Sequence, residues 1–365
     1  MKKYKFLIVG SGFFGSTFAR LATDDGYNCL VLESRNHIGG NAYTEKIDGI
    51  DVHMYGPHIF HTNDYRIWKF VNRFADFNSF ILSPKSHVDG KLYSLPFNMN
   101  TFYELWGCTT PERAKEIIDS QKFNGTPSNL EEQALSMVGK DIYELLIKGY
   151  TKKQWQKDPK DLPADIIKRL PLRFTFDNNY FNDRYQGIPE NGYTELFENM
   201  LRGIEVKLNT NYFDNRTYYN SIAETVVFTG KIDEFFNYEY GDLDYRSLEF
   251  EHRRLSTENF QGVAQMNYGS ENAPWTRIIE HKHFTGVNTN NTVITFEYPT
   301  SYDRTKVPYY PINDEINNLK YMKYRDLADT VPSVIFGGRL SEYKYYDMHQ
   351  VIASAKKKYI THMQK

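Results

Sequence analysis

The sequence predicts an α/β fold in which a parallel sheet is joined to an inserted helical lobe and an antiparallel β-sheet lobe. Three observations predict it. The first ~45 residues follow a strand, helix, strand pattern that opens a doubly wound sheet. Residues 101–150 change to helical spacing, and residues 245–300 contain alternating runs such as Thr292-Val-Ile-Thr-Phe-Glu-Tyr. At 365 residues the chain is long enough for two or three lobes.

Residues 7–15 carry a G-x-G-x-x-G motif between an apolar strand and a helix, and the next strand ends at Glu33. Gly10 permits the tight turn, Gly12 lets the backbone approach a pyrophosphate, and Gly15 lets the helix pack on the sheet. The pyrophosphate would lie at the helix N-terminus, where free N–H groups and the helix dipole favour an anion. Glu33 would accept a hydrogen bond from a ribose hydroxyl. The motif therefore predicts an adenine dinucleotide site in a Rossmann-like domain.

The segment after Glu33 distinguishes between dinucleotides. It reads Ser-Arg35-Asn-His-Ile-Gly39-Gly40-Asn41, with an arginine and a Gly-Gly pair just beyond the acidic residue. This extension resembles that of flavoproteins of the glutathione-reductase and amine-oxidase type, in which the glycines let the chain pass close to the FAD pyrophosphate. Nicotinamide-dependent dehydrogenases usually lack it. We therefore expect FAD rather than NAD.

The middle of the chain is predicted to be a helical insertion. Residues 111–118 and 129–138 carry apolar residues at helical spacing. Thr110 and Ser128 stand where N-caps belong, and Pro111 follows Thr110 at the first helical position.

Strand signals return at residues 205–209 and 225–230, and the second run ends in Thr-Gly, as expected where a nucleotide-binding domain resumes. Residues 334–340 predict another buried strand with a glycine turn, and a helix from residue 347 to about residue 357 closes the chain. We expect the FAD-binding domain to comprise residues 1–80, 196–240 and 318–365, the helical lobe residues 99–158, and the antiparallel sheet lobe residues 81–98, 159–195 and 241–317.

Composition excludes several classes of protein. Lys and Arg number 44 against 46 Asp and Glu, so the formal net charge of −2 provides no basic field for nucleic acid. The only two cysteines, Cys29 and Cys108, exclude a disulfide framework. No apolar run approaches the ~18 residues needed to span a bilayer. Because the sequence opens with a charged pair and a strand, we expect no signal peptide and a cytoplasmic protein.

Several strings between residues 55 and 349 are longer and rarer than the glycine motif. They are Tyr55-Gly-Pro-His58-Ile-Phe-His61-Thr-Asn, Leu95-Pro-Phe-Asn-Met-Asn-Thr-Phe, Ile147-Lys-Gly-Tyr150-Thr-Lys-Lys-Gln-Trp155, Arg173-Phe-Thr-Phe-Asp-Asn-Asn-Tyr180-Phe, Thr276-Arg277-Ile-Ile-Glu-His-Lys-His-Phe, Pro308-Tyr-Tyr310-Pro, and Phe336-Gly-Gly-Arg339 through Tyr345-Tyr-Asp347-Met-His. With them the chain resembles, essentially end to end, the bacterial UDP-galactopyranose mutases.

The resemblance implies a redox-neutral, flavin-dependent isomerase. The family interconverts UDP-galactopyranose and UDP-galactofuranose, the latter for cell-envelope polysaccharides, through a covalent adduct between the sugar anomeric carbon and N5 of reduced FAD. Ring contraction requires the bond between the ring oxygen and the anomeric carbon to open, and a nucleophile that displaces UDP makes this possible. The resemblance also implies an external reductant for FAD and a homodimer.

The resemblance assigns the residues that bind the UDP-sugar. Two arginines match the diphosphate clamp, Arg277 and Arg169, and Arg169 lies in a mobile substrate loop near residues 160–173. An arginine suits this task because negative charge grows on UDP as it departs. The matching aromatic residues are Tyr150 and Trp155 for the uridine, and Tyr180, Tyr310 and Tyr345 for the diphosphate. Asp347 matches a carboxylate near the sugar, and it could equally be the N-cap of the closing helix.

On the cofactor side, the resemblance places His58 and His61 beside the flavin and Arg339 where a cation favours the anionic reduced form. The expected cofactor-binding residues are Gly10, Gly12, Phe14, Gly15, Glu33, Arg35, Gly40, Asn41, Arg339 and Met348. No metal is expected, because His58, His61 and Asp64 lack a recognised metal-site spacing.

Two departures from the family pattern leave the sugar open. Gln156 follows Trp155 where relatives have glycine, and Trp275, two residues before Arg277, could narrow the sugar pocket. UDP-N-acetylgalactosamine or a nucleotide 6-deoxyhexose therefore stays an alternative substrate. An amine-oxidase-like flavoenzyme would share the FAD motifs but would need no diphosphate clamp. A non-catalytic flavin-binding scaffold would need neither the arginines nor the tyrosines.

Overall fold

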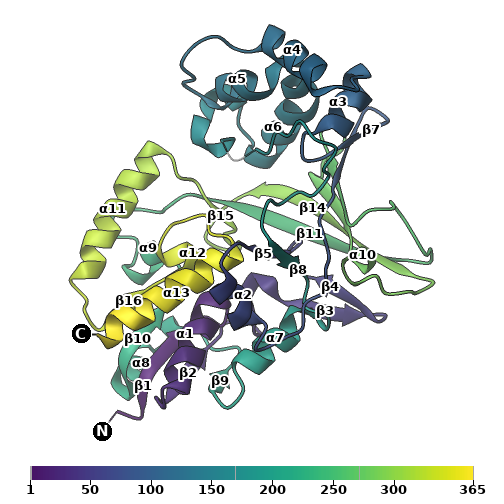
Figure 1. Cartoon of the computed structure of the whole chain (residues 1–365). Coiled ribbons are helices and arrows are strands. Elements are labelled where there is room, and N and C mark those ends of the chain that lie inside the picture. The colour runs from purple at the N-terminus through teal and green to yellow at the C-terminus, as the bar shows by residue number, and fades with distance from the viewer. Residues whose placement is uncertain (1, 169, 271, 365) are drawn as a thin grey trace.

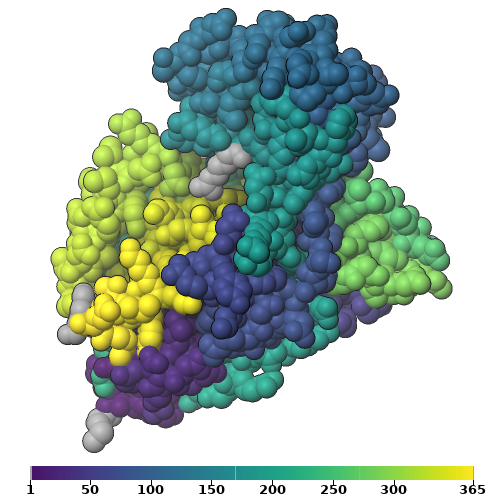
Figure 2. All heavy atoms as spheres, viewed as in Figure 1, coloured from purple at the N-terminus to yellow at the C-terminus, as the bar shows by residue number. Residues whose placement is uncertain are grey.

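The computed structural model describes residues 2–168, 170–270 and 272–364. Figure 1 shows a parallel sheet with its helices at the lower left, long strands that run to the right, and a helical lobe at the top. Figure 2 shows the same helical lobe, in blue and teal, as the upper part of the molecular surface. These parts agree with the predicted fold class. In the described part of the chain, no helix combines the length and apolar character needed to cross a membrane.

A five-stranded parallel sheet holds the N-terminal motif, with the strand order β16-β10-β1-β2-β9. On one face, Phe6 and Ile8 of β1 pack against the helices α1 and α13, which lie side by side in Figure 1. On the other face, Leu7 packs with Phe235 and Tyr324. The strands are β1 (Tyr4–Val9), β2 (Cys29–Leu32), β9 (Glu205–Lys207), β10 (Ala223–Phe228) and β16 (Val334–Phe336). The helices around them are α1 (Phe13–Asp24), α2 (Tyr65–Val71), α7 (Gly192–Met200), η5 (Tyr212–Asn215), α8 (Arg216–Ile222), α9 (Ile232–Phe235), α11 (Glu315–Asp329), α12 (Gly338–Ser341) and α13 (Met348–Met363).

A seven-stranded sheet forms the second lobe, with the order β15-β11-β14-β13-β12-β6-β7. Its strands are β6 (Lys85–Val88), β7 (Lys91–Ser94), β11 (Tyr245–Leu255), β12 (Gln265–Tyr268), β13 (Arg277–Glu280), β14 (Thr292–Ser301) and β15 (Tyr310–Pro311). The sheet is antiparallel as predicted, except that β6 pairs with β12 in parallel. This parallel pair joins the hairpin β6–β7, which precedes the helical lobe, to strands far along the chain.

The helical lobe contains α3 (Met99–Trp106), α4 (Pro111–Gln121), α5 (Leu130–Ile142), the π-helix η2 (Tyr143–Lys148) and α6 (Gly149–Trp155) around one apolar core. Thr110 caps α4 as predicted, because its side chain accepts a hydrogen bond from the Arg113 N–H. The predicted cap Ser128 is wrong by one residue. Asn129 caps α5, and Ser128 donates its N–H and hydroxyl to the Glu132 carboxylate instead.

Short elements connect the lobes. They are η1 (Gly40–Ala42), β3 (Thr44–Ile47), β4 (Ile50–His53), β5 (Phe60–Thr62), η3 (Pro159–Asp161), η4 (Ala164–Ile166), β8 (Tyr185–Gly187) and α10 (Lys282–Thr285). The strands β3 and β4 form a hairpin, and β5 pairs with β8.

A buried chain of histidines ties β4 to the seven-stranded sheet. The His58 N–H donates to His53 Nδ1 (3.0 Å), and the His53 N–H donates to His281 Nδ1 (3.2 Å). The ring of His281 also contacts Thr295 Oγ1 at 2.6 Å. Because both Nδ1 atoms accept hydrogen bonds, both rings are neutral in the fold. Burial, with some repulsion from neighbouring histidines, lowers the pKa of His281 to about 3 and the pKa of His53 well below its usual value.

These histidines predict a loss of stability in mild acid. The unfolded chain binds protons on them near pH 6.5, whereas in the folded chain the pKa of His281 is about 3 and the pKa of His53 is well below its usual value. The free energy of unfolding should therefore decrease as the pH falls below about 6.5, by up to about 1.4 kcal/mol per pH unit for each ring. Urea unfolding at pH 7.5 and 5.5 tests this, and His281→Gln should reduce the difference. An unfolding midpoint that is equal or higher at pH 5.5 would contradict it.

Candidate active site

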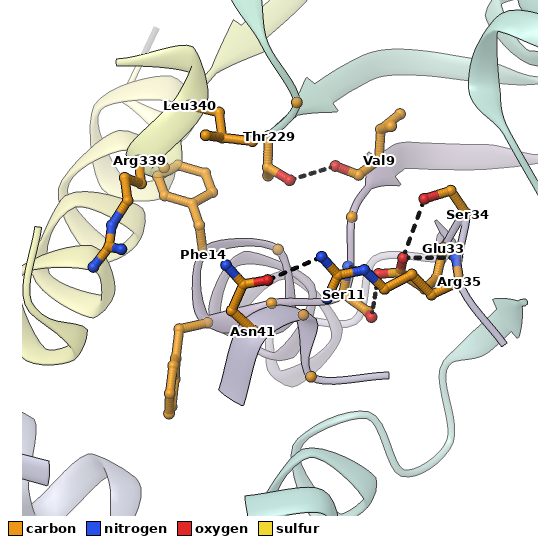
Figure 3. Close-up of a pocket in the computed structure, with 18 of the residues that line it drawn as sticks. Val9, Ser11, Phe14, Glu33, Ser34, Arg35, Asn41, Thr229, Arg339 and Leu340 are labelled. Atoms are coloured by element: carbon orange, nitrogen blue, oxygen red, sulfur yellow. Dashed lines mark hydrogen bonds between the residues drawn. The ribbon is translucent and has the colours of Figure 1, made fainter. Parts of the chain in front are cut away.

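A cavity of about 400 Å³ opens where β1, β2 and β10 end, in the range of small-molecule sites. All ten predicted cofactor residues line it, together with His58. Figure 3 shows Arg35 hydrogen-bonded to Asn41, and Arg339 on the opposite side of the cavity, with the Phe14 side chain on the side of Arg339. The carboxyl ends of parallel strands are the expected place for a nucleotide in such a sheet.

The glycines of the motif let the end of β1 and the start of α1 approach each other closely. Gly10 has φ +102°, a conformation that side chains rarely adopt. A Cβ atom at Gly15 would lie only 1.9 Å from the Gly10 carbonyl oxygen, so that the strand and α1 meet without a side chain between them. Gly12 is the N-cap residue of α1 and has no side chain to fill this end of the helix. The first N–H groups of α1 are therefore available to an anion.

Glu33 and Arg35 give the cavity its polar groups. The Glu33 carboxylate accepts hydrogen bonds from Ser11 N–H (3.0 Å) and Ser11 Oγ (2.6 Å), and from the Arg35 N–H (3.0 Å). The Arg35 side chain donates to Asn41 Oδ1 (2.9 Å), while its buried Nη1 has no partner among the described residues. An unpartnered buried guanidinium nitrogen beside a helix N-terminus fits the pyrophosphate of a dinucleotide. The residues present therefore fit FAD.

A buried ion pair lies on the sheet lobe. Arg277 on β13 stands opposite Glu297 on β14, and Arg277 Nε lies 2.8 Å from Glu297 Oε2. The Glu297 side chain is fully buried, whereas 18% of the Arg277 side chain is exposed. Burial lowers the pKa of Arg277, but the Glu297 carboxylate and nearby tyrosines reverse this shift. The guanidinium therefore stays charged and is available to an anion.

Three of the predicted tyrosines gather around this arginine. The Arg277 charge acts on the hydroxyl groups of Tyr150, Tyr180 and Tyr310, whose pKa values it lowers against the larger effect of burial. These tyrosines come from three separate segments, namely α6, a loop and β15. Burial raises the pKa of all three, so that their hydroxyls keep their protons and can donate at neutral pH. Tyr345 joins the group, with its ring 5.3 Å from that of Tyr310.

Arg339 links the tyrosines to the cofactor cavity. Its guanidinium donates to the carbonyl oxygens of Tyr309 (3.1 Å) and Tyr346 (2.5 Å) and lies 5.0 Å from the Tyr345 ring centroid. The carbonyls hold the cation at the boundary between the cavity and the tyrosine group.

His58 stands at the same boundary. Its Nδ1 lies 2.8 Å from the Gly56 carbonyl oxygen, so Nδ1 carries the proton and Nε2 carries the lone pair. Burial lowers the pKa of His58 to about 4, and the Arg339 and Arg277 charges act in the same direction. The ring is therefore a neutral hydrogen-bond acceptor at physiological pH.

His61 is not among the described residues that line the cavity. Its Nδ1 pairs with the Asp183 carboxylate at 2.7 Å, and its ring stacks on Phe181. Asp347 is the N-cap residue of α13, as one of the two predictions requires, and it also lies beside His61, whereas its place near the sugar stays a prediction. His61, Asp347 and His349 offer possible metal ligand atoms within 4.8 Å of one another. The absence of a metal stays a prediction.

The remaining candidate residues are Arg169, Trp155 and Trp275. Arg169 lies outside the described residues. Trp155 packs into the apolar core of the helical lobe. The interpretation of Trp275 is wrong, because its ring packs 4.9 Å from Phe296 in a cluster with Ile278. These two residues alternate with Glu297 and Arg277 in their strands, so Trp275 covers the opposite face of the sheet and does not line the site.

Comparisons with known proteins identify the family. The chain matches the model for UDP-galactopyranose mutase over residues 145–345 and that for an NAD(P)-binding Rossmann-like domain over residues 8–74. A dTDP-fucopyranose mutase from Escherichia coli is 40% identical over 363 residues, which cover 96% of each chain. The chain belongs to the UDP-galactopyranose mutase family. A probable UDP-galactopyranose mutase from Klebsiella pneumoniae is 39% identical over 367 residues, with 98% of this chain and 94% of that protein covered.

A solved structure supports the fold. The crystal structure of reduced UDP-galactopyranose mutase superimposes with a TM-score of 0.77 at 14% identity, with 99% of this chain and 96% of that chain covered. The predicted fold class and family are thus confirmed, and the family's activity is that of an isomerase. FAD is the cofactor of the UDP-galactopyranose mutase family, and the cavity of this member fits it.

Glu297 is the main residue that sequence reasoning missed. It lies within the run Thr292-Val-Ile-Thr-Phe-Glu-Tyr, which predicted a strand and nothing more. Every residue from Thr292 to Glu297 is buried, so a carboxylate at the end of this run requires a buried cation. An acidic residue in an otherwise buried strand was the available signal.

Gly12→Val should prevent FAD binding without unfolding the protein. The valine methyl groups would enter the space between Gly12 and Gly40, because even a Cβ atom at Gly12 would lie 4.0 Å from Gly40 Cα. We expect the flavin-to-protein absorbance ratio to fall at least tenfold. Gly12→Ala, whose single methyl makes an ordinary contact, should keep most of the flavin. Full flavin content in Gly12→Val would contradict this account of the cavity.

Glu297→Gln should lower kcat/KM at least tenfold with unchanged flavin content. The amide keeps the shape of the side chain but removes the charge that fixes Arg277, and breaking a buried ion pair is costly. The matched control is Glu251→Gln on the neighbouring strand. Glu251 pairs with Arg253 at 2.6 Å, but their side chains are 45% and 50% exposed, and exposed pairs contribute little. Equal effects of the two substitutions would contradict the role of Glu297.

Proposed function

We propose that this chain catalyses the reversible, redox-neutral contraction of a nucleotide-linked pyranose to a furanose, with UDP-galactopyranose as the substrate. The observation that carries the proposal is the position of the charged Arg277 and its tyrosines beside a cavity that fits FAD. A diphosphate leaving group needs cations and hydroxyl donors of this kind. When bound, reduced FAD would supply the nucleophile N5 for the anomeric carbon.

The chain's own residues bind and neutralise the leaving group in this proposal. Arg277 faces the diphosphate, and Glu297 holds its guanidinium from the buried side. Tyr180, Tyr310 and Tyr345 donate hydroxyl protons to phosphate oxygens, and the Tyr150 ring stacks on the base. His58, neutral and with a free Nε2 lone pair, accepts a hydrogen bond from the sugar or the cofactor. Arg169 would complete the clamp.

A dTDP-linked 6-deoxyhexose is the second candidate substrate. The chain is about as similar to a dTDP-fucopyranose mutase as to a probable UDP-galactopyranose mutase. Both substrates would present the same diphosphate to Arg277, so the residues around this arginine do not favour either one. An amine-oxidase-like reaction is disfavoured, because an amine substrate has no anionic group for Arg277 and the tyrosine hydroxyls to bind.

The purified flavoprotein, incubated with UDP-galactofuranose or with dTDP-fucofuranose, tests the proposal. We expect conversion to the corresponding pyranose only after dithionite has reduced the flavin. Chromatography of the nucleotide sugars measures this conversion. The faster of the two reactions identifies the substrate. No conversion of either sugar by a protein with bound, reducible FAD would overturn the proposal. Turnover that consumes oxygen and an amine would support the oxidase instead.

A further inference from the structure

The helix α6, which carries Tyr150, is bound to the sheet lobe along its length. We propose that Lys153 is a positioning residue that holds α6 against the loop leading into Arg277, and so keeps the nucleotide-binding aromatic residue and the diphosphate-binding arginine in register. This inference rests on the proposed function, because it assigns Lys153 to that same site. Lys153 lies in α6, three residues after Tyr150 and two before Trp155.

The Lys153 ammonium group is surrounded by backbone carbonyls. Its Nζ lies within hydrogen-bond distance of four carbonyl oxygens, which share its three N–H donors: those of Tyr268 (2.5 Å), Ser270 (3.0 Å), Ala273 (3.0 Å) and Trp275 (3.0 Å). Tyr268 is the last residue of β12, and the other three belong to the connection between β12 and β13, which leads into Arg277. Hydrogen bonds from a charged donor are about twice as strong as neutral ones. One side chain of α6 therefore contacts carbonyls near both ends of this connection.

The backbones of the two segments also touch. A Cβ atom at Gly149, the first residue of α6, would lie 2.2 Å from the Gly269 carbonyl oxygen. The absence of a side chain at this position lets the helix approach the connection closely enough for Lys153 to reach the carbonyls. The close contact and the ammonium group thus act on the same pair of segments.

The other end of α6 is fixed to the long strands. Gln156 has φ +51°, a left-handed conformation that residues other than glycine rarely adopt. Its side chain donates to the Pro299 carbonyl oxygen (3.2 Å) and accepts from Ser301 Oγ (2.8 Å). Arg246 Nε donates to the Gln154 carbonyl oxygen at 3.2 Å. Pro299 and Ser301 lie on the same face of β14 as Glu297, so α6 covers the face that carries the ion pair.

A neutral side chain at position 153 would leave four carbonyls without their cation. The connection would relax, and the distance between Tyr150 and Arg277 would no longer be fixed. The nucleotide touches both sides of this junction in the proposed site, whereas the cofactor cavity lies on the parallel sheet. The expected defect is therefore in nucleotide affinity and KM, with flavin content retained.

Calorimetric titration of the FAD-bound enzyme with UDP and with dTDP tests the inference. Lys153→Met should weaken binding of the better nucleotide at least tenfold and raise KM by a similar factor, with kcat within threefold of the wild type. Lys153→Arg should recover part of the affinity, because it keeps the charge but its planar donors cannot reach four converging carbonyls. Lys152→Met is the matched control, since Lys152 pairs with Asp158 and both side chains are partly exposed, 38% and 40%.

If the Lys153→Met variant binds the nucleotide with an affinity within twofold of the wild type, the role of Lys153 is overturned. Wild-type protein that binds neither nucleotide would overturn the proposed function instead, so the two failures are distinct. Hydrogen exchange on the wild type covers the case in which the variant does not fold. UDP or dTDP should protect amides of residues 149–156 and 265–280 together, and protection of only one segment would contradict the inference.

Discussion

A charge has to be kept inside the sheet lobe and still be available to an anion, and the cross-strand pair of Arg277 and Glu297 meets this requirement. Glu297 is fully buried, and a buried carboxylate is tolerated only with a well-placed cation. The pair exists in only one register of β13 and β14, because a shift by one residue would send the two side chains to opposite faces. The electrostatics of the site therefore also specify the pairing of these strands.

The position of the cofactor cavity relative to this pair depends on a short segment after β4. A Cβ atom at Gly56 would lie 3.5 Å from the Glu297 carboxylate, so the backbone here passes directly over the ion pair. Two residues later, His58 lines the cavity. The hydrogen bonds from His58 to His53 and from His53 to His281 fix this segment to the sheet lobe. Two sites built on different sheets thus share one rigid boundary.

Local sequence signals predicted the cofactor half of the molecule well. The rest of the site depends on contacts between segments far apart in the sequence, which local signals do not contain. The glycine motif and Glu33 lie close in sequence, and their spacing alone brought them to one cavity. Thr110 followed from local capping chemistry, whereas the choice between Ser128 and Asn129 depended on which side chain reached a free N–H. The contacts of Glu297, Lys153 and Trp275 depend on strand register and on a bent connection. The local pattern shows that Glu297 needs a cation but not which residue supplies it, and no local pattern shows on which face of the sheet Trp275 packs.

The same geometry restricts where substrate choice can arise in the proposed reaction. Arg277, held by Glu297, and the tyrosine hydroxyls bind a diphosphate, and both candidate nucleotide sugars contain this group. Trp275 packs on the other face of the sheet, so it affects the sugar only through the position of Arg277. Discrimination between the bases must then come from the side that α6 presents, where Tyr150 lies. Because Lys153 and Gln156 set the position of α6, the departure from the family pattern at Gln156 bears more directly on specificity than the departure at Trp275.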